Sequence, residues 1–205
     1  MLEAKHHFFF YPFFQHYSSW KIGRNFHEVK VIGAFDDQQL PILLLANHVS
    51  WWDGFWIMNL DVKLLKRKFH FMMLEEQLRK HWYFRLSGGY SVRKNSKSVI
   101  ESLQYTADLL QDSQHMVLMF PQGKITSLYQ YSVDFEKGLE RVLQKCKNPI
   151  QIVFLVNLTE YFVNPKPTLF MHIQSYEGEN DFTVVQTAYN VFYHSVLMYH
   201  QQIYC

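Results

Sequence analysis

Short apolar runs alternate along this chain with amphipathic stretches. The almost wholly apolar runs predict strands buried on both faces of a sheet, and they cover residues 42–46, 69–73, 116–120 and 150–158. Shorter or more polar runs predict three further strands, at residues 28–33, at 90–93 and, as an outer strand, at 167–174. The sequence therefore predicts a sheet with a largely buried centre.

The segments between these runs carry apolar residues at helical spacing. Helices are expected over residues 53–60, 74–86, 96 or 98 to 110, 134–147 and 182–204, with Ser96 or Ser98 and Asp134 as N-caps. The last helix is amphipathic and lies within residues 180–205. Alternating strands and helices predict an α/β fold, with a mostly parallel sheet covered by helices on both faces. Because ligands bind at the carboxyl ends of strands in such folds, residues 48–53, 90–93 and 120–124 are the candidate site segments.

Aromatic side chains crowd the first 20 residues. They are Phe8, Phe9, Phe10, Tyr11, Phe13, Phe14, Tyr17 and Trp20. Pro12 is expected to confine a helix here to its first turn or to kink it. Two interpretations stay open: residues 1–25 anchor the protein at the lipid headgroups of a membrane, or they form a helix that packs on the domain. No apolar run reaches the roughly 18 residues of a spanning helix, so the first interpretation implies a peripheral or monotopic protein.

Composition narrows the remaining classes. A chain of 205 residues with 48% hydrophobic content is expected to form a single domain over residues 1–205. A net charge of +2 does not suggest a nucleic-acid binder. Cys146 and Cys205 lack the spacing of metal-ligand or redox-active cysteine pairs, which favours reduced thiols in a cytosolic compartment. Together with an N-terminal membrane anchor, this predicts a protein on the cytoplasmic face of the cell membrane. The histidines lack ligand spacing, so no metal site is expected.

His48 and Asp53 are the strongest candidates for chemistry. They lie five residues apart directly after a predicted strand, so a turn between strand and helix would let their side chains meet. A carboxylate bonded to one imidazole nitrogen leaves the other nitrogen free to accept a proton. The alternative is structural: Asn47 or Ser50 caps the helix, and Asp53 is favourable near its positive end.

Three ordered blocks within residues 40–160 resemble the glycerophospholipid acyltransferase family, the lysophosphatidate-acyltransferase-like proteins. Residues 47–54 resemble its first motif (His, any four residues, then Asp), residues 89–93 its second, and residues 120–123 its third. The resemblance implies O-acyl transfer in phospholipid biosynthesis from acyl-CoA or acyl carrier protein to a hydroxyl of a membrane lipid, without metal or cofactor. The residues that it implies are His48 and Asp53 as catalytic residues and Arg93, Gln122, Gly123 and Lys124 as substrate-binding residues.

The third block departs from the family pattern. Gln122, Lys124 and Ile125 stand where the family usually has Glu, Thr and Arg. Losing the Arg removes a bidentate phosphate contact, so glycerol-phosphate acceptors are expected to be poor. Backbone amides near Gly123 are candidates for binding the oxyanion. A hydrolase and a catalytically silent acyl- or lipid-binding protein are the alternatives, although no Gly-x-Ser-x-Gly segment is present.

Overall fold

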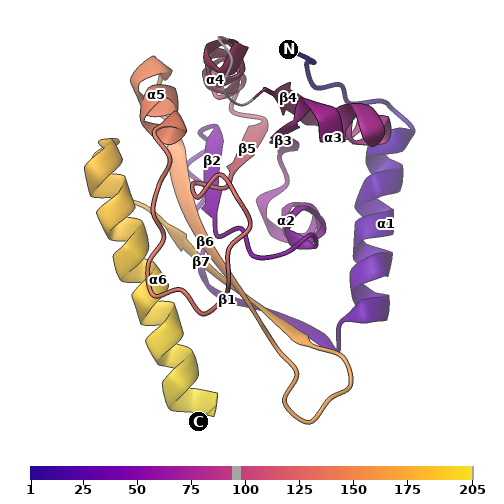
Figure 1. Cartoon of the computed structure of the whole chain (residues 1–205), viewed down its shortest axis with the longest axis vertical. Coiled ribbons are helices and arrows are strands. Elements are labelled where there is room, and N and C mark those ends of the chain that lie inside the picture. Colours follow the sequence, from indigo (N-terminus) through magenta and orange to yellow (C-terminus); the bar gives the residue numbers. More distant parts are fainter. Residues whose placement is uncertain (94–97, 205) are drawn as a thin grey trace.

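The computed structural model describes residues 1–93 and 98–204, and these contain a seven-stranded sheet in the order β1-β7-β6-β2-β5-β3-β4 (Figure 1). The strands are β1 (Glu28–Ala34), β2 (Ile42–Ala46), β3 (Lys68–Leu74), β4 (Gly89–Val92), β5 (His115–Met119), β6 (Gln151–Glu160) and β7 (Thr168–Ser175). Neighbouring strands pair in parallel except β6 and β7, which are antiparallel. The predicted α/β fold with a mostly parallel sheet is confirmed.

Helices cover both faces of this sheet (Figure 1). They are α1 (Phe10–Asn25), α2 (Asp53–Leu60), α3 (Glu75–Lys80), α4 (Ser98–Leu109), α5 (Gly138–Lys145) and α6 (Phe182–Tyr204). The fully buried strand β2 shows how the two cores arise, because alternate side chains point to opposite faces. Leu43 packs in the core under α4, α5 and α6, and Leu44 packs in the core under α1 and α2.

Three sequence-based expectations for single elements are wrong. The strand at 168–175 is not an outer strand, because β1 pairs with its free edge. The helix expected over 74–86 ends at Lys80, since His81 leaves the helical region, and residues 82–86 form a 3-10 turn. The helix expected from Asp134 begins at Gly138 instead. Ser98 begins α4, whereas Ser96 lies outside the described residues.

The late start of α5 has a tertiary cause. Val133 is buried, and its backbone N–H donates to Asn190 Oδ1 on α6 at 2.7 Å. The Asn190 side chain returns a bond to the Val133 carbonyl at 3.0 Å. These contacts hold the segment before α5 in a loop against α6. Asp134 therefore does not begin a helix, although its sequence position predicts a cap.

The aromatic N-terminal segment forms a helix that packs on the body of the protein. Pro12 lies in the first turn of α1, where its missing N–H costs nothing. The helix continues to Asn25, so the expectation that Pro12 confines it to its first turn is wrong. Phe14, Ser18 and Ile22 are buried, and α1 packs on α2. Packing is therefore confirmed, while other aromatic side chains of α1 remain exposed. Within the described residues, no helix is both long and apolar enough to cross a bilayer.

Residues 2–7, which we call the N-terminal strap, run beside the 3-10 turn and β4. Leu2 and Ser91 exchange two hydrogen bonds, from Leu2 N to Ser91 Oγ at 2.7 Å and from Ser91 N to Leu2 O at 2.9 Å. Gly88 N donates to Lys5 O at 3.2 Å. The strap thereby pairs with β4, an edge strand of the sheet whose outer backbone groups would otherwise lack partners.

Candidate active site

The segment that carries His48 is fixed where it leaves the sheet. Asn47 directly follows β2 and is fully buried. Its side-chain amide donates to Asn157 O on β6 at 2.9 Å, and its Oδ1 accepts from Asn157 N at 2.8 Å. The Asn47 side chain thus makes the two hydrogen bonds to the Asn157 backbone that a neighbouring strand would otherwise make. These bonds fix the position at which the chain turns after β2.

His48 and Asp53 meet as the sequence predicted. Asp53 is the first residue of α2, is 1% exposed, and its Oδ2 lies 2.7 Å from His48 Nδ1. The same oxygen accepts from Val49 N at 2.8 Å and from Ser50 N at 3.1 Å. These two amides orient the carboxylate, and the negative charge lies at the positive end of α2. Asn47 does not cap α2, because its side chain contacts β6 instead. Ser50 Oγ accepts from Trp52 N at 3.1 Å directly before α2, so this contact and the position of Asp53 agree with the capping alternative as well as with the catalytic one.

The imidazole is held on its edge and on one face. With Nδ1–H donating to the carboxylate, Nε2 carries the lone pair and can accept a proton. The His48 ring also stacks on Phe120, with centroids 4.0 Å apart and planes 10° from parallel. The His48 side chain is 24% exposed, so a substrate can reach it. A general base needs this combination of fixed tautomer, fixed orientation and access.

Gln122 contacts the backbone of His48 and is nearly buried. Its Oε1 accepts from His48 N at 2.7 Å, and its Nε2 donates to Thr126 Oγ1 at 2.7 Å. Thr126 N then donates to His48 O at 2.9 Å. This ring of three bonds joins the first and third sequence blocks. The sequence analysis did not identify Thr126. Its position shortly after the Pro-Gln-Gly turn could have indicated it as a partner of Gln122.

The rest of the third block forms an exposed turn. Gly123 has φ +64°, and a Cβ there would lie 3.0 Å from Glu136 Cγ, so the position requires glycine. Its N–H donates to Phe120 O at 3.0 Å and is used within the turn. Lys124 is exposed, and Ile125 is 55% exposed. An apolar side chain therefore projects where the family usually has a guanidinium.

Arg93 belongs to a cluster with Glu75 and Arg79. Arg93 Nε and Nη2 donate to the two oxygens of Glu75 at 2.8 and 2.7 Å. Arg79 Nε and Nη2 donate to Glu75 Oε1 at 3.0 and 2.8 Å. Hydrogen bonds from Arg93 and Arg79 lower the pKa of Glu75 to about 2. Glu75 and Arg79 were not expected from the sequence, because nothing local distinguishes them from a solvated helical pair.

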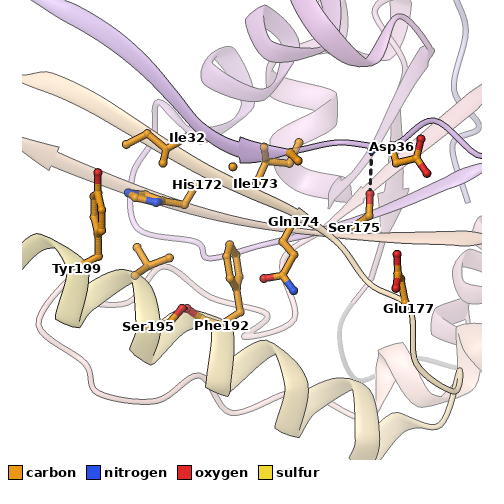
Figure 2. Close-up of a pocket in the computed structure, with 13 residues that line it drawn as sticks. Ile32, Asp36, His172, Ile173, Gln174, Ser175, Glu177, Phe192, Ser195 and Tyr199 are labelled. Atoms are coloured by element: carbon orange, nitrogen blue, oxygen red, sulfur yellow. Dashed lines mark hydrogen bonds between the residues drawn. The ribbon is translucent and has the colours of Figure 1, made fainter.

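A groove of about 590 Å³ lies apart from these residues, between α6 and the strands β1 and β7 (Figure 2). Ile32, Ile173, Phe192 and Val196 supply apolar lining. None of the six residues that the sequence nominated lines this groove. Because volume alone carries no chemistry, the His48–Asp53 pair remains the candidate active site.

Two comparisons relate this chain to known proteins. Residues 25–156 match the family model described as Acyltransferase. The chain is also similar to a 1-acyl-sn-glycerol-3-phosphate acyltransferase of Saccharomyces cerevisiae, with 26% identity over 174 residues. That match covers 76% of this chain and 54% of the relative, so the chain spans about half the length of the yeast protein. The matched residues include β2, α2 and the loop with Gln122, and the chain belongs to the acyltransferase family.

Proposed function

We propose that this protein is an O-acyltransferase that moves a fatty acyl group from a thioester donor, acyl-CoA or acyl carrier protein, to a hydroxyl of a lysophospholipid-type acceptor. The observation that carries the proposal is the 2.7 Å contact between the partly exposed imidazole of His48 and the buried carboxylate of Asp53. Family membership supports the reaction class. The yeast relative's name supports a lysolipid as the acceptor.

The chemistry follows from these groups. His48 Nε2 accepts the hydroxyl proton of the acceptor as its oxygen attacks the thioester carbonyl, and Asp53 stabilises the imidazolium. The tetrahedral intermediate then expels the thiolate, which takes the proton from the imidazolium. An ester bond forms, a thioester bond breaks, and no acyl-enzyme is needed because the substrate supplies the nucleophile. General-base catalysis of this kind contributes about 10²- to 10⁴-fold.

The acceptor headgroup follows from the third block. The side chain at position 125 is an exposed isoleucine, so the bidentate phosphate contact of an arginine is absent there. Lys124 can offer only a point charge. We therefore propose that glycerol-phosphate acceptors are poor and that acceptors with a neutral headgroup are used better.

Purified protein with a radiolabelled acyl-CoA tests the reaction and the headgroup together. Monoacylglycerol and lysophosphatidate are supplied in parallel, and labelled diacyl products are separated by chromatography. The proposal predicts acceptor-dependent product, with more from monoacylglycerol than from lysophosphatidate. Efficient acylation of lysophosphatidate would contradict the proposed headgroup preference. Release of free fatty acid without acceptor would favour the hydrolase alternative, and CoA binding without turnover would favour the silent one.

A continuous set of aromatic rings supports peripheral binding to a membrane. Phe9, directly before α1, and Phe13 and Trp20 on α1 are 60, 49 and 54% exposed. Neighbouring rings connect these side chains to Trp51, which is 64% exposed and lies three residues from His48. Aromatic rings favour the headgroup level of a bilayer, and large exposed apolar patches mark interaction sites. We propose that this aromatic face lies on the membrane and presents the imidazole to lipids.

Liposome flotation with substituted full-length protein tests this contact. Truncation of the first 20 residues is unsuitable, because the N-terminal strap pairs with β4. The triple variant Phe9→Ser, Phe13→Ser and Trp20→Ser is expected to remain with the soluble fraction. A matched control replaces Val191, Met198 and Ile203, exposed residues of α6 on the other face of the sheet, with Ser. Flotation of both variants with the vesicles would refute the proposed contact.

A further inference from the structure

The hairpin between β6 and β7 projects beyond the edge of the sheet from which His48 emerges. β6 runs parallel to β2, and Ala46, the last residue of β2, lies opposite Leu155. β6 continues to Glu160, five residues farther than Leu155, with β7 as its antiparallel partner. At about 3.3 Å per residue, the hairpin extends roughly 16 Å past the end of β2. The loop of residues 161–167 therefore lies at the far end of this hairpin (Figure 1).

The tip of the hairpin, which we define as Tyr161, Phe162 and Val163, is apolar and exposed. These three side chains are 59, 47 and 97% exposed. Lys166 is the one charged residue between positions 161 and 167, and it is exposed as well. Three consecutive exposed apolar residues are unfavourable in water and are typical of a contact surface. The tip therefore indicates a partner that takes up apolar side chains.

The turn at the tip has a defined conformation. Phe162 has φ +46°, in the left-handed region that glycine and asparagine adopt far more readily than phenylalanine. Asn164 N donates to Tyr161 O at 2.9 Å across the turn. The Phe162 ring also meets the Phe170 ring edge-on, with centroids 6.2 Å apart. Strain of this kind is retained mainly at functional sites, and here the strained turn leaves Val163 almost fully exposed.

The tip lies at the same end of the molecule as the C-terminal end of α1 (Figure 1). His27, two residues after α1, donates its backbone N–H to Pro167 O at 2.8 Å. Trp20 lies within the last two turns of α1, and the Arg24 guanidinium lies over its ring, 5.6 Å from the centroid. Arg24 and Lys166 are both exposed. Exposed rings, the apolar tip and cations that complement lipid phosphates are therefore grouped at this end.

Building on the proposed function, we propose that the tip inserts into a phospholipid bilayer as a second membrane contact beside α1. Three side chains on a single turn offer far less area than the roughly 1,000 Å² of a stable protein interface. Partition into lipid needs no such area, because each apolar side chain contributes separately. A single helix that lies on a membrane can still roll about its axis, whereas a second contact beside it fixes the orientation. The two contacts together hold the edge of the sheet that carries His48 toward the lipids.

Acidic side chains at the base of the hairpin limit the depth of insertion. Glu28 of β1 and Glu160 of β6 both lie opposite Thr168, the first residue of β7. Both glutamates are exposed. A carboxylate is costly in hydrocarbon, so this row stays on the water side of the headgroups. The tip alone reaches the boundary between headgroups and acyl chains, as is typical of interfacial segments.

Flotation of the full-length protein with vesicles of phosphatidylcholine and phosphatidylglycerol tests the tip. The tip variant, Phe162→Asn with Val163→Ser, keeps a residue that tolerates the left-handed region and removes two apolar side chains. It is expected to partition at least about tenfold more weakly than wild type. The matched control, Val191→Ser with Met198→Asn, removes two exposed apolar side chains of α6 on the other face of the sheet and should float as wild type does. Wild-type flotation of the tip variant, or an equal loss in the control, would overturn the proposal.

Circular dichroism verifies the fold of the tip variant. Because Phe162 packs on Phe170 whereas Val163 is 97% exposed, Val163→Asp decides if the tip variant fails to fold. Loss of flotation in the tip variant while the triple variant of Phe9, Phe13 and Trp20 still floats would refute only the contact of α1. Absence of acyl transfer by wild type would refute only the proposed reaction, because flotation does not depend on turnover.

A fluorophore at defined positions tests the depth of insertion. In a background of Cys146→Ser and Cys205→Ser, a fluorophore on Val163→Cys should be quenched by nitroxide-labelled lipids in the vesicles. A fluorophore on Glu160→Cys, at the base of the hairpin, should not be quenched. Equal quenching at the two positions, or none at position 163, would contradict shallow insertion of the tip.

Discussion

His70 gives a prediction in which a buried polar side chain weakens the fold. It lies in β3 at 3% exposure, and neither of its ring nitrogens has a hydrogen-bond partner among the described residues. Its ring contacts His6 and His115, with centroids 4.6 and 4.5 Å apart. Burial lowers the pKa of His70 to about 2, with smaller contributions from nearby His6, His115 and Lys68. The folded protein therefore keeps this ring neutral at any moderate pH.

The sign of the pH effect follows from this lowered pKa. The unfolded chain binds a proton at His70 below pH 6.5, while the folded chain does not until far lower pH. Stability is therefore complete above pH 6.5 and falls as the pH decreases below it. At about 1.36 kcal/mol per pH unit, the loss from this single group between pH 6.5 and 4.5 is about 2.5 kcal/mol. His70→Leu removes this loss together with two unpaired polar atoms.

Urea unfolding of wild type and His70→Leu at pH 7.0 and 4.5 measures the effect. The variant is expected to gain about 2.5 kcal/mol relative to wild type on going from pH 7.0 to 4.5. Burial raises the pKa of Asp61 to about 7, which favours the folded state toward acid, but this contribution cancels in the difference. The control His27→Leu changes an exposed histidine. A difference between His70→Leu and wild type that is the same at both pH values would refute the reasoning.

Two further predictions concern the active site. Asp53→Asn should retain the fold, because an amide oxygen can accept the three hydrogen bonds that Asp53 Oδ2 accepts. It should lower kcat about 10²- to 10⁴-fold, because it removes the charge that stabilises the imidazolium. An unchanged kcat in steady-state kinetics would contradict this prediction. Asn47→Ala should lower the free energy of unfolding by about 2 to 5 kcal/mol, since two buried backbone groups of Asn157 lose their partners. Asn157→Ala is the control for Asn47→Ala, because the Asn157 side chain makes no hydrogen bond within the described residues. Equal urea midpoints for Asn47→Ala and Asn157→Ala would contradict this prediction.

The sequence predicted correctly those parts of the fold that depend on residues close together in the chain. The fully buried β2 and the His48–Asp53 pair follow from a short segment, in which an apolar run, a turn and a helix start are adjacent in sequence. The expectation that α5 begins at Asp134 failed because Asn190, 57 positions after Val133, holds the preceding loop. A periodicity argument contains no information about such a contact.

The arginine cluster shows the same limit at the site. Glu75 and Arg93 are 18 positions apart and meet because β3 and β4 pair in one particular register. The contact between His48 and Gln122 likewise depends on the pairing of β2 with β5. A resemblance to a family nominates such residues one block at a time, whereas the sheet determines which of them touch. Thr126 and Arg79 became visible only through those contacts.

Single-turnover acyl transfer by His48→Ala tests the central claim most directly. Purified variant in excess is mixed with limiting labelled acyl-CoA and with saturating lipid acceptor. CoA binding and circular dichroism verify that donor binding and the fold are intact. A general base at Nε2 predicts that the rate of ester formation falls at least about 10²-fold while CoA binding stays at the wild-type level. Ester formation at the wild-type rate by this folded variant would contradict the role assigned to the imidazole.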